Sequence, residues 1–211
     1  MKNNLFVWLF GLLLLTAACG TGEGTETDED AQDTTETADE AMDDTMTEEE
    51  VVMSGDNYEV VMLDSEPASP RKEMRGSLGD VDVVVNYGSP LQKGRTLWGD
   101  LVPYGEVWRT GANEVTTIEV SQDVMVGGET LPAGKYGLFT IPGEDEWTII
   151  FNANSDMWGA MDYDEAEDVL RVTATPQEME EARESMDFVM DGNNLVLKWG
   201  ETMVPVEISA S

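Results

Sequence analysis

The chain has 211 residues, with 44 acidic side chains against 11 basic ones and a formal net charge of -33. A chain this acidic lacks the basic patch that binding to nucleic acid requires, so nucleic acid is excluded as a partner. The sequence has no histidine and one cysteine, which excludes Ser-His catalysis, an intrachain disulfide and zinc sites built from His or Cys.

Residues 1–18 have the layout of a secretory signal peptide. A weakly positive start is followed by an apolar run, Leu5–Leu15, and then by small residues that lead to Cys19. The run is too short to span a bilayer as a helix. The segment resembles a bacterial lipobox, although Thr16 stands where leucine is usual. The resemblance implies an exported, palmitoylated lipoprotein. It would be held on the outer membrane by acylated Cys19, on the periplasmic side or at the cell surface; the alternative is a plain signal peptide with an incidental cysteine.

Residues 19–66 are predicted to form an acidic, disordered linker between this anchor and a folded domain. Residues 20–50 consist almost wholly of Gly, Thr, Asp, Glu and Ala and contain no aromatic residue. Such a composition cannot bury enough apolar surface to offset the entropy of ordering. The acids near Cys19 could form a sorting signal for the cell surface, but we favour a solvated spacer. Val51–Leu63 regains apolar residues and is a candidate edge strand.

Residues 67–211 are predicted to form one folded domain, which is itself acidic. The segment 69–211 holds 26 acids and 10 bases, a net charge of -16, together with five of the six tryptophans. The apolar material is therefore concentrated where a core should form. A surface with this charge repels itself in dilute buffer and stays hydrated when salt screens it. We therefore hypothesise a salt-loving host.

From Asp80 onward the hydrophobic pattern has a period of two. Val81, Val83, Val85 and Tyr87 alternate with other residues, which indicates a half-buried strand. Similar runs recur at 115–121, 123–126, 136–141, 147–152, 169–175, 186–190, 195–199 and 204–208. Only residues 176–185 are typical of a helical turn or two. Roughly nine to ten short strands with little helix predict an all-β fold, an antiparallel β-sandwich of the jelly-roll or a related type.

Seven runs in this domain carry a family resemblance. They are residues 69–72, 86–90, 93–95, 99–114, 131–142, 146–152 and 158–160. On these runs the segment 69–208 resembles the domain of unknown function family 2911. The resemblance implies an exported β-sandwich found chiefly in Bacteroidetes-like bacteria, and it implies no activity.

The densest polar and aromatic segment, residues 98–117, is the predicted ligand-binding region. The candidate residues are Trp98, Tyr104, Trp108, Arg109, Asn113 and Glu114. The planar guanidinium of Arg109 suits a carboxylate or phosphate group. In one interpretation Arg109, Asn113 and Glu114 bind a ligand between aromatic walls. In the other, which we favour, Arg109 is a buried structural cation paired with an acid such as Glu114.

A second polar segment, residues 152–168, is rich in carboxylates. Asp156, Asp162 and Asp164 supply oxygen atoms of the kind that calcium prefers, but the spacing is not that of an EF-hand loop. Clustered carboxylates are expected in a chain this acidic. We therefore predict no metal site and no cofactor, with calcium as the alternative.

The sequence favours a non-enzymatic binding or structural module of the cell envelope, with no catalytic residue assigned. Its partners would be the lipid bilayer, through acylated Cys19, and a glycan or another envelope component. One alternative is a carbohydrate-binding module or a carboxylate-dependent glycoside hydrolase. Another is a calcium-stabilised adhesion domain. Trp98, Trp108 and Trp158 around one open concavity would favour sugar binding, whereas burial in the core would favour a structural role.

Overall fold

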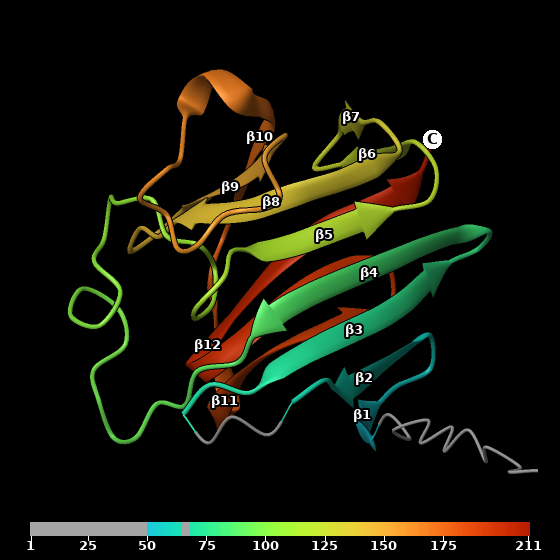
Figure 1. Ribbon diagram of the computed structural model, residues 1–211. Coiled ribbons are helices and arrows are strands. Elements are labelled where there is room, and N and C mark those ends of the chain that lie inside the picture. Colours follow the sequence, from blue (N-terminus) through green and yellow to red (C-terminus); the bar gives the residue numbers. More distant parts are fainter. Residues whose placement is uncertain (1–49, 65–67) are drawn as a thin grey trace, which may run out of the picture. The chain divides into compact units, whose positions relative to one another are not determined.

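The computed structural model describes residues 50–64 and 68–211, which form two antiparallel sheets packed as a β-sandwich (Figure 1). The larger sheet has eight strands in the order β1-β2-β3-β4-β5-β8-β9-β10, and the smaller has four in the order β11-β12-β6-β7. The predicted all-β sandwich is confirmed, with twelve strands in the described ranges where we expected nine or ten. The predicted signal peptide, Cys19 and most of the predicted linker lie outside the described residues.

The strands of the larger sheet are β1 (Glu50–Ser54), β2 (Tyr58–Met62), β3 (Arg71–Leu78), β4 (Val81–Gly88), β5 (Thr116–Val120), β8 (Gly134–Ile141), β9 (Trp147–Asn152) and β10 (Asp168–Ala174). Those of the smaller sheet are β6 (Val124–Val126), β7 (Glu129–Leu131), β11 (Gln177–Asp191) and β12 (Asn194–Ala210). A short 3-10 helix, η1 (Glu165–Glu167), precedes β10. No helix in these two ranges is long and apolar enough to cross a membrane.

The period-two pattern of β4 places its apolar side chains in the core. Val81, Val83 and Val85 are buried while Asp82 is exposed, because successive side chains of a strand point to opposite faces. The same alternation governs β10, where Leu170 and Val172 are buried. One face of the larger sheet is therefore apolar and must be covered.

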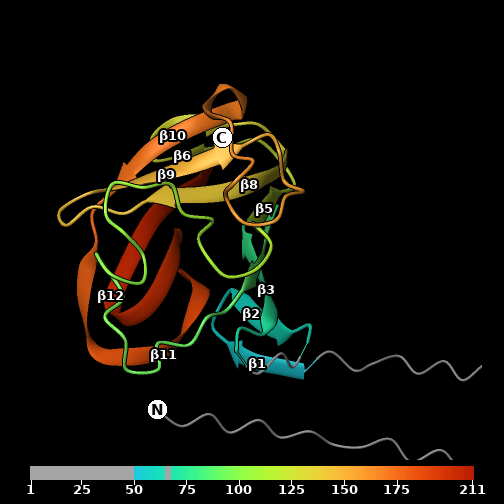
Figure 2. The same cartoon turned by 60° about the vertical axis from the view of Figure 1, so that its left-hand side comes forward.

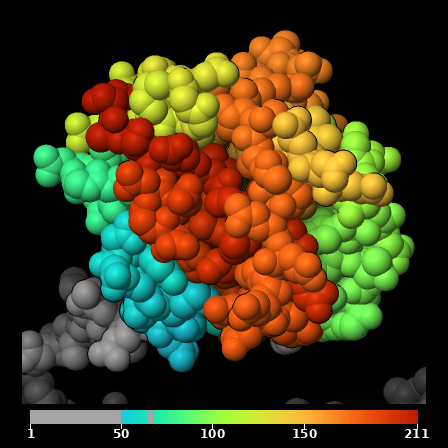
Figure 3. Space-filling model, turned by 180° about the vertical axis from the view of Figure 1, so that it is seen from behind, coloured from blue at the N-terminus to red at the C-terminus, as the bar shows by residue number. Residues whose placement is uncertain are grey.

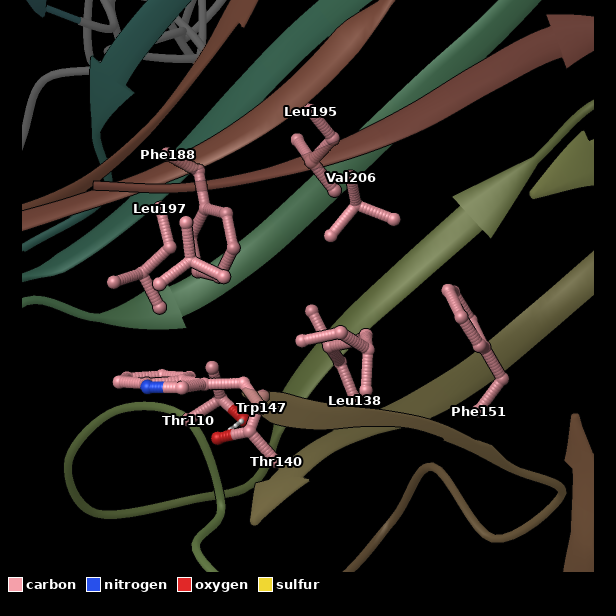
Figure 4. A pocket seen from close by; sticks show the side chains of 11 residues that line it. Thr110, Leu138, Thr140, Trp147, Phe151, Phe188, Leu195, Leu197 and Val206 are labelled. Atoms are coloured by element: carbon pink, nitrogen blue, oxygen red, sulfur yellow. Dashed lines mark hydrogen bonds between the residues drawn. The ribbon is translucent and has the colours of Figure 1, made fainter. Parts of the chain in front are cut away.

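The smaller sheet supplies that cover. Figure 4 shows Phe188 and Leu197, from β11 and β12, facing Leu138, Trp147 and Phe151, from β8 and β9. The space left between them measures about 20 Å³ and is lined almost entirely by apolar side chains. A cavity of that size holds about one water molecule at most, so this is a packing gap and not a ligand site.

The predicted helical turn at residues 176–185 is wrong. Residues 177–191 form β11, which pairs with β12 to cover the face of the sandwich drawn in orange and red in Figure 3. Its second half, Met186–Met190, is buried, whereas Gln177–Glu184 is largely exposed. The glutamates of the exposed half favour a helix by propensity, but pairing with β12 overrides that preference.

The larger sheet begins before residue 67, inside the segment predicted as linker. Val51–Leu63, expected as a single edge strand, forms a hairpin of β1 and β2, and β2 pairs with β3. Val60 and Val61 of β2 are buried. The apolar residues of this segment are therefore part of the sandwich.

A long irregular loop, residues 89–115, connects β4 to β5 at one end of the sandwich (green in Figures 1 and 2). It contains all six of the predicted ligand-binding residues. Leu91 forms an isolated bridge with Ser185 of β11, and the Trp98 indole Nε1 donates to Thr202 Oγ1 of β12 at 2.8 Å. The smaller sheet therefore holds the loop through β11 and β12.

Candidate functional site

The backbone of the 89–115 loop is fixed by hydrogen bonds despite its irregular path. The Trp108 N–H donates to Thr140 O at 2.8 Å, and the Thr140 N–H donates back to Trp108 O at 2.9 Å. The Ala112 N–H donates to Gly88 O at 3.2 Å. A Cβ at Gly88 would lie 2.2 Å from Ala112 O, so this close approach requires glycine.

Four tryptophans pack together beneath the loop. Trp98 and Trp108 from the loop meet Trp147 of β9 and Trp199 of β12. Trp108 stacks on Trp199 with ring centroids 6.0 Å apart and 17° between the planes, whereas Trp98 meets Trp147 edge-on at 4.7 Å. Such contacts add to the free energy of area burial. This tryptophan cluster locks the loop onto both sheets.

A pocket of about 410 Å³ opens between the loop and the tryptophan cluster. Three predicted residues line it, namely Trp108, Arg109 and Asn113, and the loop also contributes Arg95 and Glu106. Ligand pockets span roughly 300–1,000 Å³, so the space suits a small molecule or one unit of a polymer. We call it the Arg109 pocket.

Arg109 lacks a partner in the described part of the chain. Its Nε is buried with no hydrogen bond, and no acid of that part pairs with the guanidinium. Burial alone lowers the Arg109 pKa. Burial also lowers the pKa of Arg71, but there Glu114 and Asp64 oppose the shift. Arg109 is thus a partly buried cation that pairs with no carboxylate of the described residues, and its buried Nε–H, which lacks an acceptor, is costly.

The expected pair between Arg109 and Glu114 does not form. Glu114 Oε2 lies 3.3 Å from Arg71 Nη1 of β3 instead. Asn113 has a left-handed backbone, with φ 63, and Glu114 bridges to Trp158. Asn113 therefore lines the Arg109 pocket while Glu114 lines a separate cleft.

The other aromatic candidates lie elsewhere. Trp98 and Tyr104 line a different groove beside β12, and Trp158, which is 60% exposed, lies on the cleft that contains Glu114. Trp98, Trp108 and Trp158 thus share no concavity, and the first two contact the core cluster. That burial favours a structural role for Trp98 and Trp108.

Arg95 is a charged lining residue outside the six predicted ligand-binding residues. Its Nε donates to Gln92 O at 2.9 Å, so backbone carbonyls hold its side chain. The loop holds three cations, Lys93, Arg95 and Arg109, and only the folded structure places Arg95 in the same pocket as Arg109.

The three candidate calcium ligands lie at two different places in the structure. Asp156 and Asp162 line the cleft of Glu114, whereas the Asp164 carboxylate caps η1 by accepting from the Ala166 N–H at 2.9 Å. Within residues 50–64 and 68–211 no group of three or more His, Cys, Asp or Glu side chains is arranged to hold a metal ion. Calcium binding stays the alternative to our prediction of no metal site.

Comparison with known proteins places the domain in a family. Neither the curated proteins nor the solved structures gave a match. A family model matches residues 69–208, which include the 89–115 loop, the strands from β3 to β11 and all but the last two residues of β12. The match covers more than half of the chain. The chain therefore belongs to the family described as "Protein of unknown function (DUF2911)".

Proposed function

We propose that this protein is a non-enzymatic binding module of the cell envelope, and that the Arg109 pocket binds an anionic group of its ligand. The observation that carries the proposal is the buried Nε of Arg109, which has no hydrogen-bond partner in the described part of the chain. A carboxylate or phosphate would satisfy the guanidinium and supply its missing counter-charge.

The charge of the pocket supports an anion over a cation. Two guanidinium groups, Arg95 and Arg109, line it with one carboxylate, Glu106, which gives a local balance of +1 in a segment whose net charge is -16. Because screening limits repulsion from distant carboxylates, these near groups dominate at physiological salt. The walls that Trp108 and Trp199 contribute would contact an apolar part of the ligand.

Binding is favoured over glycoside hydrolysis at this pocket. Hydrolysis of a glycosidic bond generally uses two carboxyl groups on opposite sides of the scissile bond. Glu106 is the one carboxylate among the residues that line the pocket. The lining therefore offers groups that can hold an anion, but it lacks the second carboxyl group that cleavage of a glycosidic bond generally requires.

The anchor is part of the same proposal. Acylation of Cys19 would hold the protein on the outer membrane after export, and the acidic segment that follows would give the domain reach. In cells that are fed an alkyne analogue of palmitate, the wild-type protein should become labelled and fractionate with membranes. The Cys19→Ala variant should do neither, and labelling that persists in it would contradict the anchor.

The pocket is tested by titration calorimetry on the purified full chain, with inorganic phosphate and succinate as probes and the neutral diamide of succinate as the uncharged comparison. We expect at least one anion to bind and the diamide not to bind. Arg109→Gln should weaken binding by roughly tenfold or more, the equivalent of one charge-assisted hydrogen bond.

Arg183→Gln is the matched control, because Arg183 is an exposed arginine of β11 outside the pocket. It removes the same charge and should leave binding unchanged. Failure of every anion to bind, or equal weakening in the two variants, would contradict the proposal.

A further inference from the structure

A second cleft, with Trp158 at its edge, is unrelated to the Arg109 pocket. Its volume is about 570 Å³, within the range of ligand sites. The Trp158 side chain is 60% exposed, in contrast to the tryptophan cluster in the core. A large indole surface in water is costly, at roughly 25 cal/mol for each Å², so an exposed tryptophan beside a cleft offers a surface for a ligand to cover.

The backbone beside Trp158 is fixed. Glu114 and Trp158 form an isolated antiparallel bridge. The Val115 N–H donates to Met157 O at 3.0 Å, and the Gly159 N–H donates to Asn113 O at 3.1 Å. Met157 is buried in a small apolar cluster with Val115. Because neighbouring side chains of an extended segment alternate, burial of Met157 directs the Trp158 side chain outward.

Arg71, Asn86 and Glu114, which line the cleft, belong to a polar network. Arg71 Nη1 lies 3.3 Å from Glu114 Oε2, and Arg71 Nε donates to Asn86 Oδ1. Asn86 Nδ2 in turn donates to Glu73 Oε2 at 3.2 Å. The Arg71 guanidinium and the half-exposed Glu114 carboxylate are thus held in position by other protein groups. They present a donor and an acceptor whose orientation is set before any ligand arrives.

We propose that this cleft binds a neutral saccharide, with the C–H face of one sugar ring on the Trp158 indole. A sugar ring combines an apolar face with hydroxyl groups that both donate and accept hydrogen bonds. The cleft offers the same combination, because the indole stands beside donors such as Arg71 and Lys135 and acceptors such as Glu114 and Asp156.

Charge favours a neutral sugar over an acidic one. The ionised side chains that line the cleft are Arg71, Lys135, Glu114, Asp156 and Asp162, which sum to -1. The positive balance of the Arg109 pocket is absent here, and the Arg71 guanidinium is already paired with Glu114. An acidic sugar would therefore be repelled where a neutral sugar is not.

Titration calorimetry of the full chain tests the proposal. The probes are cellobiose, maltose and the N-acetylglucosamine disaccharide, with digalacturonate as the charged comparison. We expect at least one neutral disaccharide to bind more tightly than digalacturonate. Trp158→Ala should weaken it roughly tenfold or more, as loss of a stacked aromatic face implies. Trp158→Tyr should restore part of the affinity.

Tyr104→Ala is the matched control, since Tyr104 is an exposed aromatic residue, at 40%, on a different groove. It should bind the sugar as the wild type does. Trp158→Ala should keep the wild-type melting temperature, because its side chain is largely exposed. Arg109→Gln should keep sugar binding, so this test is independent of the anion site.

Three outcomes would overturn the proposal. They are no binding of any neutral disaccharide, equal affinity in the wild type and Trp158→Ala, and a preference for digalacturonate.

Discussion

Lys72 Nζ of β3 lies 2.7 Å from Asp187 Oδ1 of β11, and this ion pair joins the two sheets inside the core. The side chains are 8% and 4% exposed, respectively. Tyr87 OH donates to the same carboxylate oxygen at 3.2 Å, and Ser185 Oγ donates to Oδ2 at 2.8 Å. The buried carboxylate is thus satisfied by one cation and two hydroxyl groups.

Removing the cation alone should destabilise the fold. Lys72→Met leaves the Asp187 charge buried without its counter-charge, and we expect the free energy of unfolding to fall by about 3–5 kcal/mol. Lys72→Met with Asp187→Asn removes both charges. The amide keeps one acceptor oxygen for one of the two hydroxyl groups, and its N–H can donate to the other, so most of the stability should return. Urea denaturation measures both variants. A loss below about 1 kcal/mol for the single variant would mean that the pair behaves like an exposed one.

Removing the charge of Arg109 should instead stabilise the fold, because this partly buried guanidinium has no ion-pair partner among the described residues. We expect Arg109→Met to raise the free energy of unfolding of the ligand-free protein by about 1 kcal/mol, since the stem stays packed and an uncompensated charge is removed. The same variant should lose anion binding. Thermal unfolding in an anion-free zwitterionic buffer provides the measurement. A clear fall in stability would instead identify Arg109 as a structural cation.

Alkaline pH should weaken the fold through Tyr163. Tyr163 OH donates to Asp168 Oδ2 at 2.7 Å, and burial, followed by this hydrogen bond, raises its pKa from 10.0 to about 12. Between these two values the unfolded chain has released the proton while the folded chain keeps it, so stability falls as the pH rises. Burial raises the pKa of Tyr87 in the same direction.

Tyr163→Phe should make that loss of stability less steep between about pH 10 and 12. The variant also loses two hydrogen bonds, so the quantity to compare is the slope of stability against pH and not the stability itself. Melting temperatures of the wild type and the variant across this interval supply the test. Identical slopes would show that Tyr163 does not control the alkaline transition.

Salt should stabilise the domain, because the segment 69–211 has a net charge of -16. We expect the melting temperature to rise by several degrees between dilute buffer and molar potassium chloride, as screening reduces repulsion between carboxylates. Glu178→Lys with Glu181→Lys, on the exposed half of β11, should reduce the salt effect. A melting temperature that is no higher in molar salt would contradict the hypothesis of a salt-loving host.

The strands that the sequence located are those whose alternation is visible in apolar residues. β4, β5, β8, β9 and β10 fall close to their predicted positions. β3 escaped prediction because one of its core-facing positions is Lys72, which looks polar in sequence and is buried through Asp187, more than a hundred residues away. β12 was predicted as two strands because Gly200, with φ 59, looks like a turn but lies within one continuous strand.

The sequence by itself determined the all-β class and the segment in which the candidate site lies. Alternation, charge and turn residues are local properties, and each can be recognised without knowing what the residue contacts. Only the tertiary structure decided that Glu114 pairs with Arg71 and that Arg109 faces a pocket with Arg95. The side of the loop on which a side chain emerges depends on left-handed residues such as Asn113 and on contacts with distant strands. Sequence spacing encodes neither.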